Sequence, residues 1–143
     1  MKILSFLAYL MMVGGLIGLI VLKGALSSFP FGVAVQILAV LLITCARVAF
    51  GRRSFHVTAN PTEGGLVTTG PYRYIRHPIY AAVCLFTTAA VAAHCSWLTL
   101  LCGGAVWASA LVRIPLEEKL VSARYPEYRQ YAARTSRLIP YVF

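Results

Sequence analysis

Hydrophobic positions divide the chain into three long runs separated by polar segments. A membrane-spanning helix needs about 20 mostly apolar residues. Residues 3–22 form such a run without a charged residue, and residues 29–50 form a second run with one, Arg47. The third run, 79–112, carries no formal charge; as a single helix it would be about 51 Å long, well beyond the hydrocarbon thickness of about 30 Å. A helical hairpin that turns near His94 is the better interpretation.

This pattern predicts an all-α integral membrane protein with four transmembrane helices, the last two forming the hairpin. The expected spans are about 3–22, 29–50, 76–93 and 97–113. The polar segments 51–75 and 114–143 are expected to form a loop and C-terminal interfacial helices, and residues 1–143 are interpreted as one domain. Lys23 stands where a secretion signal would need a small residue, which favours a retained first span.

Composition and charge agree with a membrane protein and add an orientation. The chain is 59% hydrophobic and 12% charged, whereas soluble domains are about 45–50% apolar and about 25% charged. If Lys2, residues 51–78 and the tail after residue 112 face the cytoplasm, the outer connector 23–28 holds only Lys23 of the 13 basic residues. The positive-inside rule therefore predicts cytoplasmic termini. The net charge of +9 then requires no nucleic-acid partner.

The cysteines and the C-terminal tyrosines have structural explanations. The cysteines lie in apolar runs without a C-x-x-C pair, so we expect neither a disulfide framework nor a metal site; they are Cys45, Cys84, Cys95 and Cys102. Three tyrosines follow near-helical spacing in the tail, as an interfacial aromatic anchor would; they are Tyr125, Tyr128 and Tyr131.

Two prolines mark expected helix starts at the membrane boundary. Pro78 suits a first helical turn, which would put His77 at a helix N-terminus, where polar or anionic ligands are favoured. Pro115 is expected to begin another helix, with Glu117 and Glu118 in its first turn. A basic loop that binds lipid head groups would also explain the residues before Pro78.

Two segments together resemble a known superfamily. Residues 70–80 read G-P-Y-R-Y-I-R-H-P-I-Y, which resembles the G-x-Y-x-x-x-R-H-P-x-Y signature of the isoprenylcysteine carboxyl methyltransferase and phospholipid methyltransferase superfamily. Residues 117–140 are similar to its second signature, E-E-x-x-L followed by F-G-x-E-Y-x-x-Y-x-x-R and a later proline. The motifs stand in the family order around the apolar hairpin, and the resemblance covers residues 52–140.

The resemblance implies an integral membrane enzyme that uses S-adenosylmethionine, held under the C-terminal segment at the cytoplasmic face. Arg113 matches an arginine that faces the substrate in the prenylcysteine enzymes, so it is the candidate catalytic and substrate-binding residue, with Arg76 as a further candidate for ligand binding. His77 is expected to bind the cofactor carboxylate or to cap its helix. The implied cofactor-binding residues are Gly65, Leu66, Val67, Tyr72, His77, Pro78, Ile79, Tyr80 and Glu117.

The residue types favour a carboxylate as methyl acceptor. A carboxylate is already ionised and needs only orientation, for which Arg113 offers a planar, bidentate partner. An amine or thiol must lose a proton to a base, and His56, Glu118 or water could serve. We therefore expect carboxyl O-methylation of a prenylcysteine-like or other apolar acid that enters from the bilayer lipids, with N- or S-methylation of a lipid amine or small thiol as the alternative.

A non-catalytic membrane accessory protein of the same fold is a further alternative, because the chain departs from the family pattern at two places. Tyr125-Pro126 replaces the usual Phe-Gly, and Gly64-Gly65 stand where the prenylcysteine enzymes have bulkier polar residues.

Overall fold

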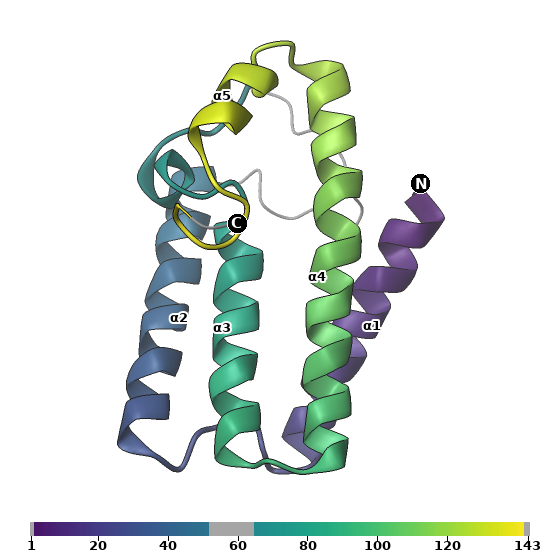
Figure 1. Ribbon diagram of the computed structural model, residues 1–143, viewed down its shortest axis with the longest axis vertical. Helices are drawn as coiled ribbons and strands as arrows, with labels where there is room; N and C mark the ends of the chain where they lie inside the picture. The colour runs from purple at the N-terminus through teal and green to yellow at the C-terminus, as the bar shows by residue number, and fades with distance from the viewer. Residues whose placement is uncertain (1, 52–64, 142–143) are drawn as a thin grey trace.

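The computed structural model describes residues 2–51 and 65–141, and the expected candidates His56 and Gly64 lie outside these ranges. Figure 1 shows the long helices running along the longest axis, with the short helical segments gathered at one end. In chain order the elements are α1 Lys2–Val21, α2 Pro30–Phe50, the 3-10 helix η2 Gly70–Arg73, α3 Pro78–Ala93, α4 Trp97–Arg124 and α5 Tyr128–Arg134. The all-helical prediction is confirmed: over the described ranges the only β-type pairing is an isolated bridge between Ile75 and Ser136.

The long helices pack in a row rather than in a closed bundle. Helix α1 packs against α4, α4 against α3, and α3 against α2. Helices α3 and α4 form the expected hairpin (Figure 1), and a capping box begins α4, in which Ser96 Oγ accepts from the Thr99 backbone N–H and Thr99 Oγ1 accepts from that of Ser96. Such reciprocal bonds satisfy two backbone donors at a helix start.

Three of the helices are long and apolar enough to cross a membrane: α1 over Ile3–Val21, α2 and α4. Helix α3 has 16 residues, about 24 Å of helix, and it begins two residues later than the expected third span because residues 74–77 are not helical. A crossing by α3, and with it the four-span topology, stays a prediction.

The prediction that a new helix begins at Pro115 is wrong. Helix α4 continues through Pro115 to Arg124. A proline inside a helix removes one backbone hydrogen bond, but here the ring is exposed, while the neighbouring Ile114 is 1% exposed and holds the helix against the core. Glu117 therefore lies five turns into a continuous helix instead of in a first turn.

Many of the residues buried between the helices are small, among them Ala39, Ala46, Ala90 and Ala110. A Cβ added to Gly15 of α1 would lie 2.7 Å from the Cys102 carbonyl oxygen of α4, so the two backbones approach closely there. Interfaces of this kind are typical of helices packed within membranes. Large apolar side chains point outward instead, as lipid contact requires; examples are Ile3, Leu7, Ile20, Ile37, Leu41 and Leu101.

Polar contacts hold the connector between α1 and α2 against α2 and against the hairpin turn. Gln36 Nε2 donates to the Ala25 carbonyl at 2.9 Å, and Gln36 Oε1 accepts from the Ser27 N–H at 2.9 Å. His94 Nε2 lies 2.7 Å from the Leu26 carbonyl oxygen. His94 thus holds a loop at the end of α3 opposite to His77, as expected for the hairpin turn.

Candidate active site

The two signature segments meet through their backbones. The Arg76 N–H donates to the Ser136 carbonyl at 2.8 Å, the Ser136 N–H donates to the Tyr74 carbonyl at 3.1 Å, and the His77 N–H donates to the Arg137 carbonyl at 3.0 Å. The C-terminal tail therefore runs beside the segment that leads into α3. These pairings bring residues 60 positions apart into one site.

His77 stands at the N-cap position of α3, directly before Pro78, but its side chain does not cap the helix. The imidazole instead lies between two carboxylates: Nδ1 is 3.9 Å from Glu117 Oε2, and Nε2 is 3.4 Å from Glu118 Oε1. Nε2 is buried and makes no hydrogen bond to the described residues. The expected helix start is confirmed, and the imidazole faces Glu117 and Glu118 instead of the backbone of the helix.

Tyr80, Arg113 and Glu117 form a closed triangle of hydrogen bonds. Arg113 Nε donates to Tyr80 Oη at 2.7 Å, Tyr80 Oη donates to Glu117 Oε1 at 2.5 Å, and Arg113 Nη2 donates to the same Glu117 oxygen at 3.1 Å. Arg113 is only 3% exposed. A buried charge is tolerated when it is paired and hydrogen-bonded, and this triangle supplies both to Arg113.

Helix α1 also reaches this triangle. Arg113 Nη1 donates to the Ser5 carbonyl at 3.0 Å, and the Arg113 guanidinium carbon lies 5.3 Å from the centre of the Tyr9 ring. Sequence reasoning missed this contribution because the first run was interpreted as a generic span. The available signal was the placement of two polar residues one helical turn apart in an otherwise apolar run.

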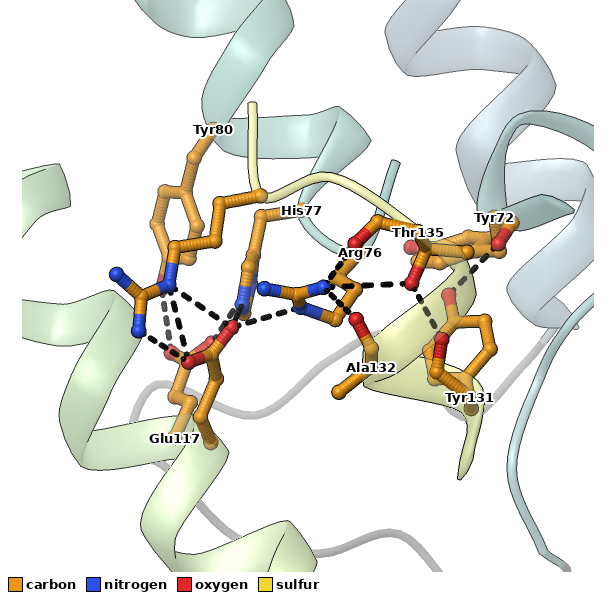
Figure 2. A network of polar contacts seen from close by, with 10 residues as sticks. Tyr72, Arg76, His77, Tyr80, Glu117, Tyr131, Ala132 and Thr135 are labelled. Atoms are coloured by element: carbon orange, nitrogen blue, oxygen red, sulfur yellow. Dashed lines mark hydrogen bonds and ion pairs between the residues drawn. The ribbon is translucent and has the colours of Figure 1, made fainter. Parts of the chain in front are cut away.

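A tail clamp, made of Arg76, Glu118 and Arg137, holds the C-terminal tail. Glu118 accepts from Arg76 Nε at 2.9 Å and from Arg137 Nη2 at 3.0 Å. Arg76 Nη1 also donates to the Ala132 carbonyl at 2.8 Å and to Thr135. Figure 2 shows the Arg76 guanidinium in contact with Ala132 and Thr135 on one side. Arg76, expected as a ligand-binding candidate, is thus used within the protein.

Glu118 is correspondingly a poor base. Polar contacts with His77, Arg137 and Arg76 outweigh the effect of burial and lower the pKa of the Glu118 carboxyl to about 2, so this carboxylate has little tendency to take a proton from an acceptor. Glu117 has a different set of described partners: Tyr80 and Arg113 donate to it, and His77 lies nearby. Its side chain is 22% exposed, against 14% for Glu118.

The tyrosines of the tail pack inward in part. Tyr128 is 7% exposed, and Tyr131 Oη donates to the Tyr72 carbonyl at 2.7 Å (Figure 2). Burial raises the pKa of Tyr72 and Tyr128, and it raises the pKa of Tyr131 to about 12. All three phenols therefore stay neutral at physiological pH, and Tyr131 remains a donor that joins the tail to η2.

The expected site residues are distributed over two neighbouring places. The structure brings His77, Tyr80, Arg113 and Glu117 together, with Pro78 and Ile79 in the same helical turn as Tyr80. Gly65, Leu66 and Val67 form the half-buried strip that leads to η2 and Tyr72. Gly65 has φ +88°, a backbone conformation that glycine adopts without strain.

The long apolar helices and the buried ionic cluster at one end of them are typical of an integral membrane protein with a polar site. The sequence profile of the phospholipid methyltransferase family matches residues 27–128. The chain therefore belongs to this family, within the superfamily of integral membrane methyltransferases that its two signatures resemble. A search of curated proteins found no match. The match leaves out α1 and the tail, and so also Ser5, Tyr9 and Arg137.

Proposed function

We propose that the protein transfers a methyl group from S-adenosylmethionine to a lipophilic acceptor at the cytoplasmic face of the membrane. The observation that carries the proposal is the cluster of His77, Tyr80, Arg113 and Glu117, which forms where the two signature segments meet. The family supports the reaction class, and the concentration of basic residues in the polar segments supports the orientation.

The chemistry of the cluster fits the proposed cofactor. The His77 imidazole, whose Nε2 faces Glu118 Oε1 at 3.4 Å, suits the carboxylate of S-adenosylmethionine, and the Glu117 carboxylate suits its amino group or ribose hydroxyls. The Tyr80 ring and the carboxylates suit a cationic sulfur. The residues proposed to hold the cofactor are Gly65, Leu66, Val67, Tyr72, His77, Pro78, Ile79, Tyr80 and Glu117.

The residues of the chain would position the reacting groups and exclude water, and they would form no covalent bond to either reactant. When bound, S-adenosylmethionine supplies a methyl group on a positively charged sulfur, and transfer of that group to a carboxylate moves no proton. Catalysis then depends on holding the reacting atoms in line and excluding water. Arg113 would orient the acceptor, and the tail clamp would keep the C-terminal segment closed over the signature segment.

A carboxylate of an apolar acid, such as a prenylcysteine, is the acceptor we propose, because a buried guanidinium at the site attracts an anionic oxygen. Methylation of a lipid amine or small thiol is the second candidate. Two observations favour an amine: the family description names phospholipids, and the site holds two neighbouring carboxylates, Glu117 and Glu118, which would attract an ammonium group.

Calorimetric titration of the detergent-solubilised protein with S-adenosylhomocysteine tests cofactor binding. We expect saturable binding that His77→Ala and Glu117→Ala remove, while His94→Ala, a histidine at the opposite end of α3, retains it. Folded protein without saturable binding would contradict the proposal.

Transfer of a labelled methyl group then separates the acceptor classes. N-acetyl-S-farnesylcysteine presents a carboxylate, and phosphatidylethanolamine vesicles present an amine. Labelling of the first supports the proposed acceptor, and labelling of the second alone replaces it with the amine. Cofactor binding without transfer to any lipid of a membrane extract would support the non-catalytic alternative.

A further inference from the structure

Helix α1 carries two polar side chains on one face, at the end where the site lies. Ser5 and Tyr9 stand four positions apart in the sequence, so they lie above one another on the same side of the helix. Ser5 is 1% exposed, and the Tyr9 ring lies 5.3 Å from the Arg113 guanidinium carbon. Both residues therefore face the ionic cluster and not the lipid.

The two polar groups of Ser5 are used differently. Its backbone carbonyl accepts from Arg113 Nη1 at 3.0 Å. Its hydroxyl is buried and has no hydrogen-bond partner among the described residues. A buried donor without a partner is unfavourable, because it has lost its bonds to water without replacing them. The Ser5 hydroxyl is thus an unused donor on a residue whose backbone carbonyl contacts a buried cation.

A buried hydroxyl without a hydrogen-bond partner does not by itself indicate a ligand, as Thr87 shows. Its hydroxyl is also buried without a hydrogen-bond partner among the described residues, but Thr87 lies two helical turns beyond Tyr80 along α3, where its methyl group packs near Gly103 of α4. Ser5 differs because Arg113 and Tyr9 adjoin it. The unused hydroxyl and the cation together point to a ligand.

We infer that the Ser5 hydroxyl and Arg113 form a subsite for the anionic oxygen of the acceptor, so that α1 helps to select which molecule is methylated. The inference rests on the proposed function and specifies its acceptor group. A serine hydroxyl donates to a carboxylate oxygen, and a guanidinium attracts that oxygen and repels an ammonium group. The family match begins at residue 27, so this subsite includes a part of the chain that the family profile does not cover.

Binding of a charged and an uncharged probe to the full chain in detergent tests the subsite. The probes are labelled N-acetyl-S-farnesylcysteine and its methyl ester, measured by equilibrium dialysis with saturating S-adenosylhomocysteine. We expect Ser5→Ala to weaken binding of the acid by about tenfold or more, as loss of a hydrogen bond to a charged group does, and to leave binding of the ester within about twofold. Thr87→Val removes the other unused hydroxyl and should change neither affinity.

Ser5→Thr keeps the hydroxyl and should bind the acid as the wild type does. If Ser5→Ala does not fold, Ser5→Cys replaces it as the test variant, because its side chain has a similar size and only a weak donor. Unchanged acid binding in the folded Ser5 variant overturns the subsite, and so does an equal loss for acid and ester. A wild-type protein that binds S-adenosylhomocysteine but not the acid also overturns the subsite, yet leaves the methyltransferase proposal standing. If the wild-type protein does not bind S-adenosylhomocysteine, the proposed function is contradicted instead. Binding of the acid is then measured in the absence of S-adenosylhomocysteine and tests the subsite separately.

Discussion

Arg113 and Glu117 lie one helical turn apart on α4, on either side of Pro115, and the Arg113 Nη2 donates to Glu117 Oε1 at 3.1 Å. The pair links two proposed tasks: Glu117 is assigned to the cofactor and Arg113 to the acceptor. One Glu117 oxygen also accepts from Tyr80, to which Arg113 donates as well, so Tyr80 is a second link between the two residues.

Removing the Tyr80 hydroxyl tests the triangle. Tyr80→Phe keeps the ring but deprives Arg113 Nε of its acceptor and Glu117 of a donor. We expect the free energy of unfolding to fall by about 1–3 kcal/mol and kcat to fall by about tenfold or more, measured by thermal unfolding and methyl transfer. Tyr74→Phe is the matched control, since Tyr74 is 52% exposed in the same signature segment; equal effects at both tyrosines would argue against the triangle.

Replacing Arg113 by lysine should separate acceptor from cofactor. A lysine keeps the charge but cannot donate simultaneously in the directions of Tyr80, Ser5 and Glu117. We expect the KM for the acceptor to rise by about tenfold or more, while the affinity for S-adenosylhomocysteine stays within about threefold. Arg124→Lys, at the exposed end of the same helix, serves as the control. Equal losses of acceptor and cofactor binding in Arg113→Lys would contradict the assigned role.

The tail clamp should matter for cofactor binding. Glu118→Gln removes the charge that pairs with Arg76 and Arg137, and breaking such a partly buried pair leaves two cations uncompensated. We expect faster tryptic cleavage at Arg134 and an S-adenosylhomocysteine affinity about five to ten times weaker, or about 1 kcal/mol. Glu127→Gln removes an exposed carboxylate before α5 and should change neither; a tail that is cut no faster in Glu118→Gln would show that the clamp is dispensable.

Pro115→Ala should stabilise the protein. The substitution adds an N–H that can donate within α4, and proline is about 3 kcal/mol less favourable than alanine inside a helix. Because Pro115 is exposed, no core contact is lost. Circular dichroism in detergent should show a higher unfolding temperature, and a lower one would mean that the proline is required for the geometry around Arg113 and Glu117.

Hydropathy predicted the helices well because each long helix must be apolar over many consecutive residues to lie in lipid. The same reasoning failed at Pro115. Local preference places a proline at a helix start, but packing of Ile114 and the pairing of Arg113 with Glu117 across the proline keep α4 continuous. Tertiary contacts outweighed a local signal, and no pattern within the run of residues reveals that balance.

The candidate site was predictable only where motifs carried it. His77, Tyr80 and Glu117 stood in signatures whose order suggested a shared site. The pairing of residues 74–77 with the tail produces no periodic pattern of hydrophobic and polar residues in the sequence, because it consists of backbone hydrogen bonds between distant segments. The Ser5 contribution left only two polar positions in an apolar run, which are easily explained as chance.

The row of helices has a consequence for how acceptor choice could diversify. Helix α1 stands at one end of the row and joins the remainder mainly through α4, whereas α2 and α3 pack on the other side. A terminal helix of this kind can be exchanged without unpacking its distant neighbours. Chimeras that join the first helix of another family member to residues 27–143 would therefore change the acceptor that is methylated. They would replace the contribution of α1 to the site and keep both signature segments.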